Sequence, residues 1–182
     1  MELTEKDKNA LLDLAKNTIA AKLNKKDMPQ IAVDSAILKE KRGAFVTLKK
    51  RGHLRGCIGY IKAVKPLRET VQEMAIAAAF HDPRFPALKA EELKDLSFEI
   101  SVLSPLSRIK DVSEIEVGKH GLYIINGYNS GLLLPQVAVE YKWDRETFLR
   151  ETCHKAGLPA QAWQDEATEI YIFSADYFGA VD

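Results

Sequence analysis

The chain has 182 residues, 46% of them hydrophobic, which is enough for a sizeable core and predicts a single domain over residues 1–182. Lys+Arg and Asp+Glu both number 26, so no net charge draws the protein to nucleic acid or to an anionic membrane. Two cysteines are too few for a disulfide scaffold and match no zinc spacing, so we expect free thiols and no metal site. A charged N-terminus without an apolar signal core, and no apolar stretch of membrane-spanning length, predict a cytoplasmic protein.

Apolar periodicity and turn residues predict the elements of the first half in chain order. Thr4 and Asp7 form a capping box that marks the start of the first helix. Pro66 begins a later helix at a position where its missing N–H costs nothing, and Pro83 and Pro86 stop that helix from resuming. The predicted elements are an amphipathic helix over 4–24, an extended connection over 27–40, a hairpin with strands at 44–48 and 54–61, a helix over 66–80, a short helix over 89–94 and a strand over 97–103.

Turn-forming and capping residues mark the predicted elements in the second half of the chain. The sequence Asn-Gly-Tyr-Asn-Ser-Gly at 126–131 separates two apolar runs and predicts a second hairpin, and Asp144 is the expected N-cap of a helix that Gly157 closes. About six strands, mostly joined as hairpins with helices between them, predict an α+β fold with an antiparallel or mixed sheet and flanking helices. The predicted elements are strands over 122–125, 132–134 and 169–175, helices over 135–142 and 145–156, and a fraying tail over 176–182.

The most unusual stretch is Leu-Arg-Gly-Cys-Ile-Gly at residues 54–59. Two glycines interrupt a β-rich run there, which predicts a bulge or a close approach of another group to the backbone. Strand alternation predicts that Leu54 and Ile58 face the core. The same alternation places Arg55 and Cys57 together on the other face, where a cation favours the reactive thiolate. The structural alternative is that Cys57 is a small buried hydrophobe and Arg55 a surface residue.

Three other polar groups are candidates for a site. Asp82 and Arg84 flank a proline at the end of a helix, where they either line a site or simply pair with each other. Glu99 lies on the polar face of a predicted strand, where it is either solvated or a candidate acid, base or hydrogen-bond acceptor. His120 and Gly121 belong to a glycine-flanked corner that leads into another strand.

Several function classes lose support. No GxGxxG, Walker loop, HExxH, GxSxG or CxxC occurs, and the sequence indicates no particular cofactor. The basic turn at residues 49–51 could contact phosphate, but zero net charge and the lack of a stacking-aromatic motif favour a solvated turn over nucleic-acid binding.

Four motifs in this order resemble the signature of the AMMECR-type domain family: Leu-Arg-Gly-Cys-Ile-Gly at 54–59, Asp-Pro-Arg-Phe at 82–85, Val-Gly-Lys-His-Gly-Leu at 117–122, and Leu-Pro-Gln-Val-Ala at 134–138 with Glu140 and Trp143. The resemblance covers nearly the whole chain. It implies one α+β domain in which a larger sheet-and-helix part and a smaller β part leave a cleft between them. It implies no settled activity, and it implies a pathway shared with Memo-like proteins and radical-SAM enzymes. The family's motif residues correspond to Arg55, Gly56, Cys57, Gly59, Asp82, Arg84, His120 and Gly121.

Two functions compete for these residues. Glycine-rich backbone and arginines suit the recognition of a carboxylate or phosphate, so the leading hypothesis is binding of a small anionic ligand or a partner protein in a cleft. The alternative is an enzyme or enzyme subunit in which Cys57 is the nucleophile and His120 or Glu99 its base. Binding leads because the sequence places no second residue next to Cys57. The expected ligand-binding residues are Arg55, Gly56, Gly59, Asp82, Arg84 and Gly121.

Overall fold

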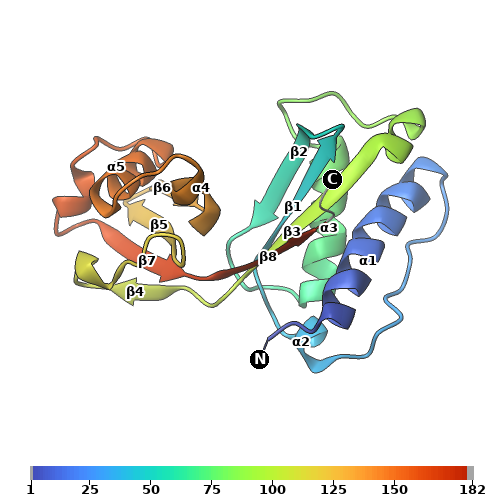
Figure 1. The fold of residues 1–182 in the computed structure, drawn as a ribbon, viewed down its shortest axis with the longest axis horizontal. Helices are drawn as coiled ribbons and strands as arrows, with labels where there is room; N and C mark the ends of the chain where they lie inside the picture. Colours follow the sequence, from blue (N-terminus) through green and yellow to red (C-terminus); the bar gives the residue numbers. More distant parts are fainter. Residues whose placement is uncertain (1, 180–182) are drawn as a thin grey trace. The chain divides into compact units, whose positions relative to one another are not determined.

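The computed structural model describes residues 2–179 and separates them into two compact units (Figure 1). Residues 2–103 and 176–179 form the first unit, and residues 104–175 form the second. Each unit has a four-stranded sheet, with strand orders β2-β1-β3-β8 and β4-β7-β5-β6. The strand pairs β1–β2, β1–β3, β4–β7, β5–β6 and β5–β7 are antiparallel, so the α+β prediction is confirmed.

The first unit combines its sheet with two long helices. The predicted first helix and its capping box are confirmed, since Thr4 accepts from the Asp7 N–H and the Asp7 carboxylate accepts from the Thr4 N–H. The elements of this unit are α1 (Glu5–Leu23), α2 (Ala36–Lys39), β1 (Ala44–Lys50), β2 (His53–Tyr60), α3 (Leu67–Phe80), the 3-10 helix η1 (Ala90–Asp95), β3 (Leu96–Leu103) and β8 (Ala175–Gly179).

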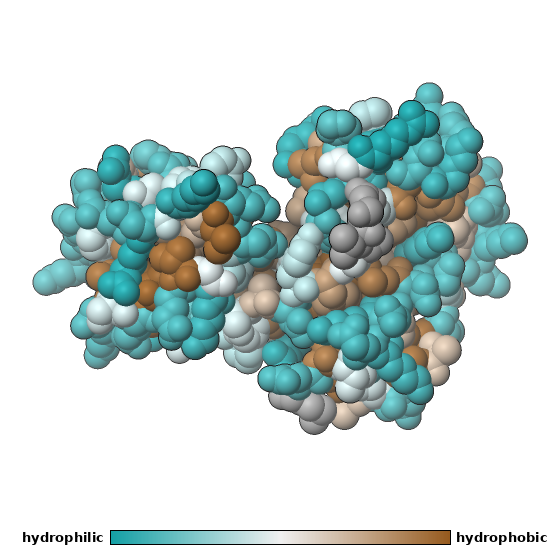
Figure 2. Space-filling model, viewed as in Figure 1, coloured by the Kyte–Doolittle hydropathy of each residue, from teal (hydrophilic) through white to brown (hydrophobic). Residues whose placement is uncertain are grey.

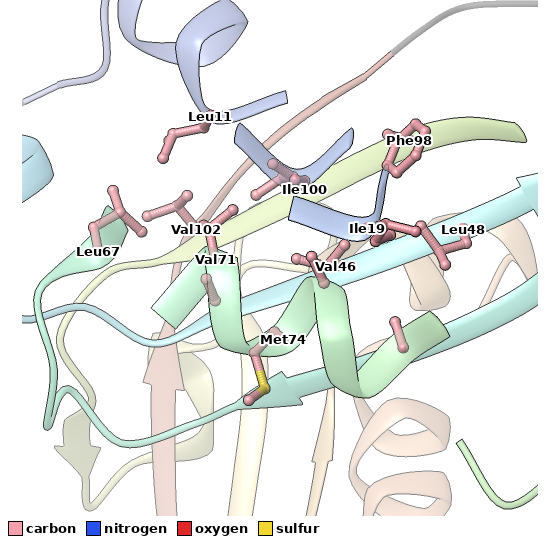
Figure 3. Packing of buried hydrophobic residues seen from close by; sticks show 14 of the residues in the cluster. Leu11, Ile19, Val46, Leu48, Leu67, Val71, Met74, Phe98, Ile100 and Val102 are labelled. Carbon is pink, nitrogen blue, oxygen red and sulfur yellow. The ribbon is translucent and has the colours of Figure 1, made fainter. Parts of the chain in front are cut away.

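The core of the first unit lies between the sheet and the helices α1 and α3. Figure 3 shows Ile19 of α1, Val71 of α3, and Val46 and Ile100 of the sheet gathered in this layer, and all four are fully buried. Burying a side chain of this size stabilises the fold by about 1.5–3 kcal/mol. The other face of the sheet carries the residues that alternate with these, including Thr47.

The β1–β2 hairpin contains the predicted bulge. Arg51 and Gly52 form its turn with positive φ values of 50° and 78°. The register runs evenly up to Leu48 opposite Gly56 and then shifts, so that Lys49 lies opposite Leu54 and Arg55 is the extra residue.

The bulge corrects the prediction that Leu54 and Ile58 share the core face. Ile58 packs against the core, whereas Leu54 is 43% exposed on the opposite face. The extra residue breaks the period of two on which that prediction depended.

The second unit has its own core, centred on the fully buried Phe148, Leu122 and Ile124. The predicted cap of α5 is confirmed, because the Asp144 carboxylate accepts from the Thr147 N–H at 2.8 Å. The elements of this unit are β4 (Ser107–Ile109), the 3-10 helix η2 (Val112–Glu114), β5 (Gly121–Asn126), β6 (Asn129–Leu133), α4 (Pro135–Glu140), α5 (Arg145–Lys155), the 3-10 helix η3 (Ala162–Gln164) and β7 (Glu169–Phe173).

The C-terminal segment differs from the prediction. Residues 176–179 do not fray but belong to β8, an edge strand of the first sheet, and Phe178 packs against the core of that unit. The rest of the predicted tail, 180–182, lies outside the described residues. The short strand β4 was also missed, because three residues carry almost no periodic signal.

The outer surface is largely polar. Hydrophilic residues cover much of the face shown in Figure 2. Within residues 2–179, no helix combines the length and the apolar character that a membrane span requires.

Candidate functional site

Asp82 and Arg84 lie against the outer edge of β2 at Cys57. The Asp82 carboxylate accepts a hydrogen bond from the Cys57 N–H at 2.9 Å, and Nη2 of Arg84 donates to the Cys57 carbonyl oxygen at 3.3 Å. Since β2 is an edge strand, these two side chains bind the backbone groups that a neighbouring strand would otherwise bind. The Asp-Pro-Arg-Phe motif therefore closes the edge of the strand that carries residues 54–59.

Asp82 and Arg84 also pair with each other, as one of the two sequence interpretations expected. Nε and Nη2 of Arg84 donate to the two carboxylate oxygens at 3.0 and 2.8 Å, and the Arg84 N–H donates to Oδ1 at 3.1 Å. The Arg84 guanidinium, helped by the Cys57 N–H, holds the pKa of Asp82 far below its usual range. The Asp82 side chain is 1% exposed and that of Arg84 is 54% exposed, so a buried acid holds a solvent-facing arginine.

Arg55 is bound by a carboxylate that sequence reasoning missed. Its Nε and Nη2 each donate to one oxygen of Glu92 at 3.1 Å, and Nη2 also donates to the Pro86 carbonyl oxygen at 2.9 Å. Lys50 donates to the same carboxylate at 2.8 Å. The hydrogen bonds from Arg55 and then Lys50 lower the pKa of Glu92 to about 2.

This pairing corrects the interpretation of Arg55 as a surface residue, because Arg55 is only 8% exposed. Its Nη1 is buried and has no hydrogen-bond partner within the described part of the chain. No sequence signal identifies Glu92, which lies 37 residues further along the chain.

The Phe85 ring makes cation–π contacts with both arginines. The guanidinium carbons of Arg55 and Arg84 lie 5.9 and 5.5 Å from the centroid of the Phe85 ring. Contacts of this kind stabilise by about 0.5–1 kcal/mol at exposed sites. The last residue of the Asp-Pro-Arg-Phe motif thus has a packing role beside both charged pairs.

Cys57 belongs to a row of side chains on the sheet face opposite α1 and α3. Thr47 lies opposite both Cys57 on β2 and Glu99 on β3, so the three side chains share this face. The Thr47 hydroxyl donates to Cys57 Sγ at 3.1 Å, and Cys57 is half-buried. Glu99 pairs with Lys49 at 2.5 Å. Strand alternation predicted that Arg55 lies beside the Cys57 thiol. In the structure, the Thr47 hydroxyl contacts this thiol instead.

Two glycines of the motif are explained by close packing. A Cβ added at Gly56 would lie 2.1 Å from the carbonyl oxygen of Ala78 in α3, and one added at Gly59 would lie 2.2 Å from the Phe45 ring. The predicted close approach is thus confirmed, and the approaching groups are the protein's own backbone and side chain. A role of these glycines in ligand binding stays a prediction.

His120 and Gly121 belong to the second unit. Nδ1 of His120 accepts a hydrogen bond from the Glu116 N–H at 3.0 Å, which closes the corner before β5. A Cβ at Gly121 would lie 2.2 Å from the Phe173 ring, so packing requires glycine there. The proposed partnership of His120 with Cys57 stays a prediction, as does the ligand-binding role of Gly121.

The charges of the basic turn are paired within the chain. Lys49, Lys50 and Arg51 pair with Glu99, Glu92 and Asp95, so each of these charges has an internal partner. Among residues 2–179, no three His, Cys, Asp or Glu side chains gather in a way that could hold a metal ion.

Two cavities of the first unit lie away from the motif residues. One of about 640 Å³ and one of about 180 Å³ are both lined by parts of α1 and of the connection after it. Neither is lined by residues 54–59 or 82–85. The predicted cleft along residues 54–59 therefore stays a prediction.

The fold and the site define a class: α+β proteins with two four-stranded sheets, in which an Asp-Pro-Arg-Phe corner closes the edge of a Leu-Arg-Gly-Cys-Ile-Gly strand. The AMMECR1 family matches residues 12–178, and the chain belongs to this family. The family predicted from the four motifs is thus confirmed, and the match runs through both units.

Relatives and a solved structure agree with this assignment. A protein of Methanothermobacter thermautotrophicus is 49% identical over 148 residues, which cover 78% of this chain and 77% of that protein. One of Methanopyrus kandleri is 42% identical over 186 residues, covering 97% and 90%. The crystal structure of an uncharacterised protein from Pyrococcus horikoshii has a TM-score of 0.86 and 43% identity, and covers 93% of this chain and 89% of that one. The names of these three proteins state no activity.

Proposed function

We propose that this AMMECR1-family protein is a binding protein in which Arg84 receives a carboxylate or phosphate of a small ligand or partner protein. The observation that carries this proposal is the pairing of Arg84 with a buried carboxylate while its own side chain stays 54% exposed. An arginine already held in one position loses little side-chain freedom on binding, and its planar guanidinium suits carboxylate and phosphate groups.

Solvent exposure favours Arg84 over Arg55 as the binding cation. Both arginines are paired with a carboxylate, but the Arg55 side chain is buried, whereas that of Arg84 is exposed and its Nη1 has no hydrogen-bond partner among residues 2–179. Asp82 neutralises much of the Arg84 charge. We therefore expect modest affinity that depends on geometry more than on net charge.

The test compares the response of two arginine variants to inorganic phosphate. Arg84→Gln removes the proposed binding group, and Arg108→Gln is a matched control, since Arg108 is 55% exposed and is paired with Glu169 at 3.2 Å. At a hundred times its dissociation constant, a ligand raises the free energy of unfolding by about 2.7 kcal/mol. Relative to chloride at equal ionic strength, phosphate is expected to raise the melting temperature of the wild type and of Arg108→Gln, but not of Arg84→Gln. Equal rises in all three proteins would overturn the proposal, because they would reflect the general effect of phosphate on protein stability.

Partners and location remain part of this proposal. Memo-like proteins and radical-SAM enzymes are the proposed partners, and an acidic group on such a partner could bind Arg84. Cys57 and Cys153 are both free thiols, which supports the proposed cytoplasmic location.

A second candidate is chemistry at Cys57, and the hydrogen bond from Thr47 favours it. A hydroxyl that donates to Sγ stabilises a thiolate, which is the nucleophilic form of cysteine. Glu99 lies in the same cross-strand row and is the candidate base within the first unit.

Alkylation by iodoacetamide tests this second candidate. Cys57 of the native protein is expected to react faster than free cysteine at neutral pH, while the fully buried Cys153 stays unmodified. Thr47→Val, which lacks the hydroxyl, should react more slowly than the wild type. Mass spectrometry of the two cysteine peptides measures both rates. If Cys57 reacts no faster than free cysteine, or only after unfolding, it is not a nucleophile.

A further inference from the structure

A groove runs along α1, away from the site described above. The chain that leaves α1 returns alongside the helix towards α2 (Figure 1), and the cavity of about 640 Å³ lies between the helix and residues 29–33. Gln72 of α3 holds this connection in place, since its Nε2 donates to the Pro29 carbonyl oxygen at 3.1 Å and to the Thr18 hydroxyl at 3.3 Å. The volume is typical of ligand sites. We call this cavity the α1 groove and use six of its lining residues: Asn9, Asp13, Asn17, Gln30, Ile31 and Val33.

One wall of the α1 groove is a ladder of polar side chains. Asn9, Asp13 and Asn17 follow one another at intervals of four residues on the groove side of the helix, so they are spaced by about 6 Å. Side chains on one side of an extended peptide repeat every two residues, at about 6.6 Å. A side-chain amide has donors and an acceptor and can bind the C=O and N–H of a peptide unit. None of these three side chains has a hydrogen-bond partner within residues 2–179.

The opposite wall offers free backbone. Residues 30–33 are in neither a helix nor a strand, and no hydrogen bond within the described chain involves their N–H or C=O groups. Backbone groups left in this way can bind an extended chain as a neighbouring strand would. Ile31 and Val33 pack partly against the core and give this wall an apolar surface.

We propose that the α1 groove binds about five residues of an extended peptide from a partner protein, with a basic side chain over Asp13. The length follows from the eleven helical steps between Lys6 and Asn17, about 16.5 Å of helix, divided by about 3.3 Å for each extended residue. Asp13 is the acidic group of the lining and lies in the middle of the ladder, while Lys6 lies at one end. The family match begins at residue 12, so Asn9 precedes it while Asp13 and Asn17 lie within it.

The test is an NMR titration of the ¹⁵N-labelled full chain with the peptide acetyl-Val-Thr-Lys-Thr-Val-amide. At millimolar peptide, the backbone amides of residues 30–33 and the side-chain amides of Asn9 and Asn17 are expected to shift. The same peptide with Glu in place of Lys should bind about tenfold more weakly, because it places a like charge over Asp13. Absence of shifts at residues 30–33, or equal binding of the two peptides, overturns the proposal.

A pair of variants separates binding from folding. The double variant Asn9→Ala, Asn17→Ala should lose about tenfold in affinity for each amide removed. Alanine is the better helix former, so this variant should stay folded. Lys16→Ala is the matched control, because Lys16 is exposed on the same helix and does not line the groove, and it should bind as the wild type does. Unchanged binding in the double variant contradicts the proposed ladder.

Discussion

Replacing Glu92 by glutamine is expected to lower the free energy of unfolding by about 3–5 kcal/mol, because it leaves the Arg55 guanidinium buried without a counter-charge. The Arg55 side chain is only 10% exposed, so it cannot turn to water as Lys50, at 37%, can. Denaturant unfolding measures the change. Glu91→Gln is the matched control, since Glu91 is an exposed neighbour on η1, and it should change stability by less than about 0.5 kcal/mol.

The lowered pKa of Glu92 predicts that the free energy of unfolding depends on pH. This pKa falls from the ordinary value of 4.5 to about 2 on folding. The contribution of Glu92 to the free energy of unfolding is therefore complete above pH 4.5 and is lost as the pH falls towards 2. That shift corresponds to about 3 kcal/mol, because each pKa unit is worth about 1.4 kcal/mol. Glu92→Gln should therefore lose stability at neutral pH and show a weaker acid dependence. A loss below about 1 kcal/mol at neutral pH, or an unchanged acid dependence, would contradict this account of the Arg55 pair.

Replacing Asp82 by alanine is expected to destabilise the protein by about 3 kcal/mol, because charge-assisted hydrogen bonds to the Cys57 N–H and to Arg84 are lost together. The edge of β2 opens at the same time, so the Cys57 amide should exchange with solvent faster and the protein should associate at high concentration. Unfolding and hydrogen exchange measure the two effects.

An exposed acid provides the control for this variant. Asp34 pairs with Lys39, but its side chain is 83% exposed, so Asp34→Ala should cost less than about 1 kcal/mol and leave exchange at Cys57 unchanged. If Asp82→Ala unfolds more easily while the Cys57 amide stays protected, Asp82 acts only through Arg84 and the edge-closing role is wrong.

The two motifs around β2 have structural roles that leave few groups for function. Packing requires glycine at positions 56 and 59, and Glu92 binds Arg55. The Asp82 carboxylate already accepts hydrogen bonds from the β2 backbone at Cys57 and from Arg84. The groups that remain are the solvent-facing side of Arg84 and the thiol of Cys57. For this reason the functional proposals rest on these two residues.

Local signals were sufficient for most of the fold. The capping box at Thr4, the N-cap at Asp144 and the second hairpin each involve residues within a few positions of one another, and the structure confirms all three. The hairpin turn is shorter than predicted, because residues 129–131 already belong to β6. Alternation likewise placed Phe98 in the core and Glu99 on the opposite face of β3. Such patterns can be predicted because the interactions that stabilise them lie within one turn, cap or strand.

The other features of the fold and of the site depend on contacts between residues far apart in the sequence. The sequence alone determined the α+β class, the helices and hairpins, and the family to which the four motifs belong. Only the tertiary structure showed that β8 returns to the first sheet, that a bulge turns Arg55 towards Glu92, and that Asp82 closes the edge at Cys57. These contacts join residues 25 or more positions apart, and a single sequence carries no periodic signal that connects them. The physical reason is that the folded chain brings buried charges and unpaired backbone groups to their partners wherever in the sequence those partners lie.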